Sequence, residues 1–380
     1  MRLTLVIPTL RGGGAERVLS TLANAWANVG HTVSFLTFEQ NGPQEFELSA
    51  SIQYRPLPLA SVSANRLAGL TSNLRRLRIL RSAIRESRPE VVISFTSNAN
   101  VLTILAAAGL GAPVIVSERS DPLQFKISRL WSALRAMTYP FADAIVCQTG
   151  SAAARLGRAT RHKVVVIPNP VALRVHSLGS RTTATGKKIF AMGRLDPIKG
   201  FDLLLYAFQS IARQHPEWSI TILGEGPERQ GLERLAFSLG IADRVSLPGW
   251  VPEPFPLLAE AEFFVLSSRV EGFPNALCEA MACGVPVIAF DCPSGPAEIV
   301  RHQVDGLLVA PQDPHALASA MDRLMSHPKE RMQLRLRAPE VAQRFGVEDV
   351  LRRWDALFQQ NGSAEPVGGN SLLIREQNDC

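Results

Sequence analysis

The sequence predicts an α/β protein that contains two doubly wound, mostly parallel sheets. Its 380 residues exceed the length of one typical domain and suggest two or three. Strand-like segments alternate with helical patterns along the chain, and these segments are rich in Val and Ile without alternating polar residues. That pattern is typical of parallel strands that helices cover on both faces.

The predicted elements fall into two halves of similar size. A segment rich in Ser, Thr and Gly, residues 172–188, interrupts the alternation and predicts the linker between two domains. The first domain then covers residues 1–175, and the second covers residues 186–345. A last helical pattern at residues 347–360 follows the second sheet, and we expect the polar tail, residues 361–380, to be disordered. The predicted strands are residues 3–8, 32–38, 91–95, 113–117, 144–149, 163–169, 188–193, 219–226, 244–250, 262–268, 285–290 and 306–311.

The composition argues against several classes of protein. No run of eighteen apolar residues occurs, so we expect no membrane-spanning helix. The first ten residues, MRLTLVIPTL, lack a small-residue cleavage site and indicate a buried strand rather than a signal peptide, so we expect a cytoplasmic protein. The five cysteines form no C-x-x-C pair, which predicts free thiols and no bound zinc.

The net charge of +6 is unevenly distributed. Residues 1–175 carry 20 Lys and Arg against 9 Asp and Glu, a net charge of +11, and the remainder carries −5. Two basic amphipathic segments, residues 66–88 and 124–137, favour contact with an anionic membrane surface, with packing of their apolar faces on the sheet as the alternative. Nucleic acid fits less well, because no binding module is recognisable and the basic segments carry few aromatic residues. The apolar positions are Leu70, Leu74, Leu77, Leu80 and Ile84 in the first segment and Phe125, Trp131 and Leu134 in the second.

A glycine-rich loop, RGGGAER at residues 11–17, follows the first predicted strand and precedes a helix that ends near Gly30. Glycines allow the backbone to approach a ligand, and a helix N-terminus offers N–H groups to phosphate. The loop has neither the Gly-Lys-Ser/Thr of a Walker loop nor the spacing G-x-G-x-x-G. An ordinary glycine turn is therefore the alternative to a phosphate-binding loop.

Two further loops follow strands of the second half. GEGPER, residues 224–229, departs from the dinucleotide fingerprint at Arg229, and we interpret it as a strand-to-helix turn that could line a ligand. In GRLDPIKG, residues 193–200, Arg194 and Lys199 flank a turn that contains proline. A guanidinium fork and a point charge at the carboxyl end of a strand suit a diphosphate, whose leaving charge they could neutralise. The alternative is two solvated cations.

Two glutamates lie eight positions apart in EGFPNALCEA, residues 271–280. Glu271 belongs to the loop after a predicted strand, and Glu279 lies within the following helix, so the two do not form a pair on one helix face. Carboxylates accept hydrogen bonds, which suits hydroxyl-rich ligands such as sugars and ribose. A solvated glutamate and a capping glutamate remain the alternative.

Together these motifs resemble those of retaining glycosyltransferases with the GT-B architecture, in the large E-x7-E (GT4-like) family that includes bacterial polysaccharide and lipid-carrier sugar transferases. The resemblance rests on GGGAER, GRLDPIKG, the element from Glu271 to Glu279, and residues 293–309. It implies two Rossmann-like domains that face a central cleft, the first for the acceptor and the second for the donor. It also implies that the final helix, residues 347–360, crosses back onto the first domain.

The resemblance implies a role for each motif. Arg194 and Lys199 would bind the donor diphosphate and stabilise the leaving group, Glu271 would hold the hydroxyls of the donor sugar, and Glu279 would hold the nucleotide ribose. The remaining residues of the implied donor site are Gly13 and Gly14 from the first domain, Gly224 in the turn that could line the ligand, Trp250 and Val251 beside the base, and Gly272, Phe273, Asn275, Ala276 and Leu277 around the start of the helix.

One position departs from the family pattern. Many relatives have a histidine after the strand of residues 113–117, where this chain has Arg119 following Glu118. Such retaining transferases are thought to react on one face of the sugar, with the donor phosphate accepting the acceptor's proton, a route that needs no side-chain base. Arg119 is then expected to contact phosphate or an acidic acceptor, and Glu118 to contact acceptor hydroxyls.

The function implied by the resemblance is transfer of a hexose or N-acetylhexosamine from a nucleotide sugar, UDP-linked, to a polyprenyl-diphosphate-linked glycan on the inner face of the cell membrane. We expect no cofactor and no metal, because the chain has no Asp-x-Asp element. The alternatives are a glycosyltransferase with a soluble acceptor and a UDP-sugar epimerase of the same architecture.

Overall fold

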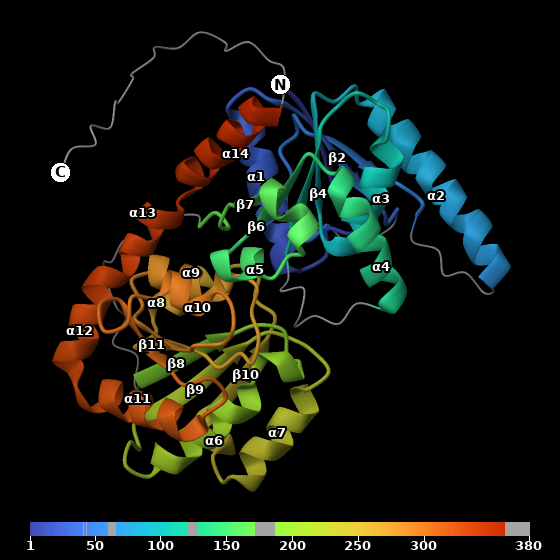
Figure 1. Ribbon diagram of the computed structural model, residues 1–380. Coiled ribbons are helices and arrows are strands. Elements are labelled where there is room, and N and C mark those ends of the chain that lie inside the picture. Colours follow the sequence, from blue (N-terminus) through green and yellow to red (C-terminus); the bar gives the residue numbers. More distant parts are fainter. Residues whose placement is uncertain (41, 43, 60–65, 120–127, 172–186, 362–380) are drawn as a thin grey trace, which may run out of the picture.

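The chain folds around two separate parallel sheets, which lie one above the other in Figure 1. The computed structural model describes residues 1–40, 42, 44–59, 66–119, 128–171 and 187–361, with side chains undescribed at 66–73. Nearly all of the predicted linker and of the predicted tail lies outside these residues. The expected α/β class with two parallel sheets is confirmed, and each sheet has helices on both faces.

The N-terminal sheet has seven strands in the order β3-β2-β1-β4-β5-β6-β7, and every neighbouring pair is parallel. The sequence analysis missed β3, because its residues QYRP have no apolar run and lie at the sheet edge, where only one side is paired. The strands are β1 (Arg2–Ile7), β2 (Thr32–Thr37), β3 (Gln53–Pro56), β4 (Val91–Phe95), β5 (Val114–Glu118), β6 (Ala144–Cys147) and β7 (Val164–Val166).

Helices cover both faces of this sheet, and each face has its own core. Along β1, Leu3, Leu5 and Ile7 pack into the core beneath α1, whereas Val6 packs into the core beneath α2 and α3, as expected for the period of two in a strand. The elements are α1 (Gly14–Asn28), α2 (Arg66–Glu86), α3 (Ser97–Ala107), α4 (Arg129–Thr138), η1 (Tyr139–Phe141), α5 (Gly150–Ala154) and η2 (Arg158–Lys163).

The two basic amphipathic segments pack their apolar faces on the sheet. Leu80 and Ile84 of α2 are buried, and Trp131 and Leu134 of α4 pack against the same core. Leu70 and Phe125 lie outside the residues whose side chains are described. The predicted apolar faces therefore stabilise the N-terminal domain, and Leu74 is the exception, since it is half exposed.

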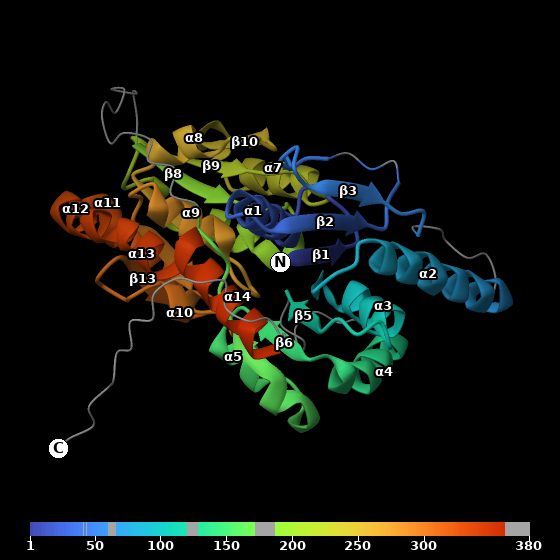
Figure 2. The same cartoon turned by 90° about the horizontal axis from the view of Figure 1, so that it is seen from above.

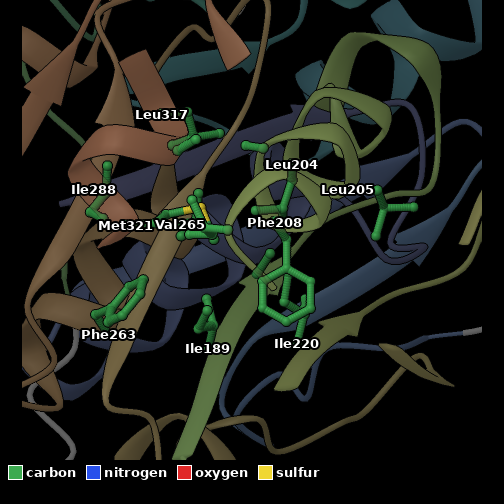
Figure 3. Close-up of a cluster of buried hydrophobic side chains, with 14 of the residues drawn as sticks. Ile189, Leu204, Leu205, Phe208, Ile220, Phe263, Val265, Ile288, Leu317 and Met321 are labelled. Carbon is green, nitrogen blue, oxygen red and sulfur yellow. The ribbon is translucent and has the colours of Figure 1, made fainter. Parts of the chain in front are cut away.

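The C-terminal sheet has six parallel strands in the order β10-β9-β8-β11-β12-β13. One face packs against α6, α7 and α11 through side chains such as Phe208 and Met321, shown in Figure 3. The other face packs against α8, α9, α10 and α13. The strands are β8 (Lys187–Met192), β9 (Trp218–Leu223), β10 (Val245–Gly249), β11 (Phe263–Leu266), β12 (Val287–Phe290) and β13 (Gly306–Val309). The helical elements are η3 (Pro197–Lys199), α6 (Phe201–Ala212), α7 (Arg229–Ser238), η4 (Ala242–Arg244), α8 (Phe255–Ala259), α9 (Asn275–Ala282), α10 (Pro296–Ile299), α11 (Pro314–Ser326), α12 (Pro328–Arg337), η5 (Ala338–Glu340) and α13 (Val341–Phe345).

The last helix, α14 (Val347–Asn361), returns to the N-terminal domain. Trp354 meets Trp26 of α1 edge to face, with ring centroids 5.7 Å apart, and stacks on Phe95 of β4 at 6.4 Å. Phe345 lies just before α14, and its carbonyl oxygen accepts a hydrogen bond from the N–H of Val171 at 2.7 Å. Residues near the C-terminal end of the chain therefore complete the N-terminal core. Figure 2 shows α14 from above.

Candidate active site

A buried ion pair lies at the carboxyl ends of β8 and β11. Nζ of Lys199, in η3, donates to Oε1 of Glu271 at 2.6 Å, and Oγ of Ser268 donates to the same oxygen at 2.6 Å. Oγ of Ser294 donates to the main-chain oxygen of Glu271 at 2.7 Å. Glu271 is 6% exposed, so its carboxylate is fixed in a nearly enclosed position. A carboxylate held in this way can read the hydroxyls of a ligand at the sheet edge.

The backbone around Lys199 explains how the lysine reaches this carboxylate. Gly200 ends η3 with φ +63°, and a Cβ there would lie 2.1 Å from the carbonyl oxygen of Ser267. Only glycine allows the turn to approach the loop after β11 so closely. Oγ of Ser267 then donates to the carbonyl oxygen of Lys199 at 3.0 Å, which joins the two loops directly.

Arg194, the other predicted cation, lies apart from the pair. Its Nε donates to Oδ2 of Asp196 at 2.8 Å, and its side chain is 73% exposed. Lys199 instead packs its methylene groups over Gly193, where a Cβ would approach Lys199 Cδ to 3.3 Å. The structure therefore brings Lys199 and Glu271 together and leaves Arg194 at the rim of the same loop.

The loops after β9 and β10 carry Gly224, predicted to line the ligand, and Trp250 and Val251, predicted to lie beside the base. Gly224 has φ +142°, and a Cβ there would lie 2.0 Å from the carbonyl oxygen of Gly193, so this glycine is required for packing between the loops. Trp250 is exposed, and its Nε1 lies 3.9 Å from the position of a Cβ on Gly12 of the N-terminal loop. Val251 is half-buried and packs against the core of the C-terminal domain.

Helix α9 (Asn275–Ala282) starts four residues after Glu271. Gly272 and Phe273 are buried, and Phe273 meets Phe345 edge to face at 5.6 Å, so this ring belongs to the core. Leu277 is also buried, and its N–H donates to the carbonyl oxygen of Pro274 at 3.1 Å. Asn275 and Ala276 are half-buried, whereas the other predicted residues around this helix start are buried.

The glycine loop of the N-terminal domain faces the start of α9. Gly13 is the N-cap of α1 in an extended conformation, and a Cβ on Gly14 would lie 3.2 Å from Nδ2 of Asn275. Nδ2 of Asn275 donates to the carbonyl oxygen of Gly14 at 3.4 Å. Across the same interface, Nη1 of Arg17 lies 3.0 Å from Oε1 of Glu279. The two predicted donor-binding segments of the two domains thus lie in direct contact.

Arg119 connects the end of β5 with this interface. Its guanidinium lies over the ring of Phe95, 4.3 Å from the centroid, and donates to Ser117 Oγ at 3.3 Å and to Asn169 Oδ1. Nδ2 of Asn169 in turn donates to Oδ1 of Asn275 at 2.6 Å. Desolvation lowers the pKa of Arg119 to about 9, an effect that the nearby carboxylate of Glu16 partly offsets.

Glu118 points into the N-terminal core. It is 3% exposed, and its two carboxylate oxygens accept from Ser97 Oγ at 2.6 Å and from Tyr139 Oη at 2.7 Å. Burial raises the pKa of Glu118, and the two hydroxyls and Arg135 oppose that rise. The expected contact with acceptor hydroxyls stays a prediction, and both carboxylate oxygens already accept hydrogen bonds from side chains of the N-terminal domain.

Sequence reasoning did not identify several residues that organise this site. Ser268 and Ser294 orient Glu271, and Asn169 joins Arg119 to α9. Arg17 belongs to the GGGAER motif, but no spacing in the sequence pairs it with Glu279, 262 residues away. The described residues contain no group of three or more His, Cys, Asp or Glu that could hold a metal ion, and none of their helices is both long and apolar enough to cross a membrane.

Two parallel α/β domains in contact through a glycine loop and a carboxylate-bearing helix form the GT-B architecture of glycosyltransferases. Comparison with known proteins agrees: residues 12–175 match the sequence profile of Glycosyltransferase Family 4, and residues 180–341 match that of Glycosyl transferases group 1. The chain belongs to this family, whose members are retaining and need no metal.

Individual relatives support this assignment over nearly the whole chain. The GalNAc-alpha-(1->4)-GalNAc-alpha-(1->3)-diNAcBac-PP-undecaprenol alpha-1,4-N-acetyl-D-galactosaminyltransferase of Campylobacter jejuni is 30% identical over 95% of this chain and 99% of its own. The lipopolysaccharide core biosynthesis glycosyltransferase LpsE of Rhizobium meliloti is 29% identical over 87% and 91%. Anabaena HepE in complex with UDP shares the fold with a TM-score of 0.76 at 18% identity, covering 95% of this chain and all of that one. Sucrose-phosphate synthase from Thermosynechococcus elongatus gives 0.80 at 20% identity, covering 94% and 98%.

Proposed function

We propose that this glycosyltransferase moves a hexose or an N-acetylhexosamine from a UDP-sugar to a polyprenyl-diphosphate-linked glycan. The observation that carries the proposal is the contact of Lys199 with the buried Glu271, which fixes a cation beside a carboxylate in the loop that leads into the N-terminus of α9. These groups suit a diphosphate and a sugar. The Campylobacter relative, named for a substrate linked to PP-undecaprenol, and the relatives of lipopolysaccharide biosynthesis support the lipid-linked acceptor.

Within this proposal each side chain has a task. Lys199 and Arg194 bind the diphosphate and stabilise the negative charge that develops on UDP as the bond from the anomeric carbon to the phosphate oxygen breaks. Arg194 reaches the diphosphate from its exposed position after leaving Asp196. Glu271 accepts hydrogen bonds from donor-sugar hydroxyls, and Glu279 accepts those of the ribose.

The acceptor hydroxyl attacks from the face that the diphosphate leaves, which retains the anomeric configuration. Its proton passes to the departing phosphate oxygen, so the products are the extended glycan and UDP, and no side-chain base is needed. Arg119 does not serve as that base. Its guanidinium, fixed by Phe95 and Asn169, holds positive charge near the contact of Asn169 with Asn275 of α9.

An exposed apolar surface on α4 and η1 supports binding to a membrane. The outward side of α4 and η1 exposes Leu130, Met137 and Phe141, each between 67% and 76% exposed and spaced at seven and four residues. Nζ of Lys163, at the end of η2, donates to the carbonyl oxygens of Pro140 and Ala142, which places the basic turn η2 beside Phe141. Exposed apolar side chains next to a basic turn fit insertion into an anionic bilayer.

The activity test uses purified protein, a panel of radiolabelled nucleotide sugars, bacterial membrane extract and excess chelator. Label from one UDP-sugar in the organic-extractable lipid fraction is the expected result. Label in water-soluble product alone would favour a soluble acceptor instead. An altered sugar nucleotide without any transfer would favour the epimerase and overturn the proposal.

The membrane test measures sedimentation with vesicles that contain phosphatidylglycerol. We expect binding to fall when Met137 and Phe141 are both changed to Ser. The matched control is Phe237→Ser on α7 of the C-terminal domain, because Phe237 is 80% exposed but lies far in the fold from α4. Equal binding by the double variant and the wild type would contradict the proposed surface.

A further inference from the structure

Arg17 forms an ion pair with Glu279, the carboxylate that we assign to binding of the donor ribose. Its Nη1 lies 3.0 Å from Oε1 of Glu279, and its guanidinium carbon lies 5.6 Å from the ring centroid of Phe255. The Arg17 side chain is 31% exposed and that of Glu279 is 12% exposed. The two residues belong to different domains and line an interdomain pocket together with Thr21 and Asn275. The ion pair therefore lies where a ligand could enter between the domains.

The ion pair is one of two contacts between the first turns of α1 and α9. Asn275 and Glu279 are four residues apart on α9 and so share one face of the helix. Asn275 contacts Gly14 of α1, and Glu279 contacts Arg17 of α1, one turn further on. The segment that carries the proposed phosphate-binding glycines is thereby tied to the face that carries the proposed ribose-binding carboxylate.

Glu279 cannot fully bind both Arg17 and a ribose at the same time. A carboxylate that binds the vicinal hydroxyls of a ribose accepts one hydrogen bond from each with its two oxygens, and Arg17 takes one of these oxygens. Arginine also binds a carboxylate more strongly than a hydroxyl does, because the donor is charged. A ribose must therefore displace Arg17 before it can engage Glu279 fully.

We propose that Arg17 is a placeholder for the donor ribose: it holds Glu279 and the docked α1–α9 contact until a nucleotide donor displaces it. This inference rests on the proposed ribose-binding role of Glu279. It makes Arg17 a residue that lowers affinity for the nucleotide and couples nucleotide binding to release of the N-terminal glycine loop.

The experiment measures the dissociation constant of UDP by calorimetry for the full-length chain. Arg17→Gln should bind UDP about two- to fivefold more tightly, the factor expected for removal of a partly exposed ion pair. Glu279→Ala should bind UDP more weakly. Thermal unfolding of each variant checks that the fold is kept.

Two matched variants separate this effect from general loosening of the domain interface. Glu298 makes a comparable interdomain contact, accepting from the N–H groups of Gly150 and Ser151 at 2.8 and 3.0 Å, but it lies at α10. Glu298→Ala should therefore not tighten UDP binding. Arg352→Gln, which removes an exposed pair with Asp349 on α14, should have no effect on it.

The outcomes distinguish the two assignments. Weaker binding by Glu279→Ala with unchanged or weaker binding by Arg17→Gln would overturn the placeholder and leave the ribose site standing. Unchanged binding by Glu279→Ala would overturn the ribose site and the placeholder with it. Equal tightening by Glu298→Ala and Arg17→Gln would show that the domain contact, and not competition at Glu279, sets the affinity, which also overturns the placeholder.

Discussion

Lys199 and Glu271 come from loops 72 residues apart, and their side chains meet at 2.6 Å at the edge of the C-terminal sheet. The Glu271 side chain is 8% exposed and that of Lys199 is 25% exposed, so water reaches the pair poorly. A lone carboxylate or ammonium there would lose much of its solvation without compensation. The two halves of the pair therefore depend on each other, as expected of the site that we propose for the donor.

Substitution of Glu271 should abolish most of the transfer activity. We expect Glu271→Gln to lower kcat/KM about 10- to 100-fold, because an amide cannot replace the charged acceptor for Lys199 and for sugar hydroxyls. Glu271→Ala should lower it further while the fold is kept. Steady-state transfer of labelled sugar measures both, with circular dichroism to monitor folding, and near-normal turnover by the Ala variant would contradict the assignment.

Gly200 should be far less tolerant of a side chain than Gly240, another glycine with positive φ. Gly200→Ala is expected to cost about 3 kcal/mol, because left-handed strain adds to a clash with the carbonyl oxygen of Ser267. Gly240 has φ +68° and no atom within 4 Å of a new Cβ, so its substitution measures the backbone strain without a clash. Gly240→Ala should cost about 1 kcal/mol. Urea unfolding of both variants checks this, and equal losses would show that the clash relaxes.

The buried Glu118 should make stability depend on pH. Its pKa is raised in the folded protein, so the folded state holds this proton to higher pH than the unfolded chain. The contribution to folding is fully present below the unfolded pKa near 4.5 and is lost as pH rises through the folded pKa. The groups facing Glu118 are Ser97, Tyr139 and Arg135.

Glu118→Gln should remove that dependence. Since a hydroxyl can accept as well as donate, Ser97 can accept a hydrogen bond from the new amide. We expect the free energy of unfolding of the wild type to fall from pH 5 to pH 8 relative to that of Glu118→Gln. Chemical denaturation of both proteins at the two pH values measures the difference, and parallel pH profiles would contradict it.

Trp354 should be essential for closing the N-terminal core. It is buried between Trp26 and Phe95, so Trp354→Ala should lower the free energy of unfolding by about 3–5 kcal/mol. Leu336→Ala on the outer side of α12, where the side chain is exposed, should change it by less than about 0.5 kcal/mol. Denaturant titration distinguishes the two, and a small loss for Trp354→Ala would mean that α14 contributes little to the core.

The predicted strands were found because each buried parallel strand is a run of apolar, often β-branched residues whichever sheet it joins. The edge strand β3 was missed because its sequence, QYRP, carries no such run, and its position is fixed by pairing with β2. The apolar faces of α2 and α4 were ambiguous for a related reason. A helix that packs on a sheet and one that lies on a membrane show the same period of 3.6 residues.

The sequence by itself determined the α/β class, the glycine and glutamate motifs, and the loops that carry Lys199, Glu271 and Glu279, since each depends on residues that are neighbours in the chain. Only the tertiary structure decided which of these residues meet. It joined Lys199 to Glu271, separated Arg194 from them, enclosed Glu118, and set Arg17 against Glu279. The physical reason is that the contacts of Glu118, Lys199 and Arg17 join residues 21, 72 and 262 positions apart. Such contacts depend on how loops and domains pack, which a local sequence pattern does not specify.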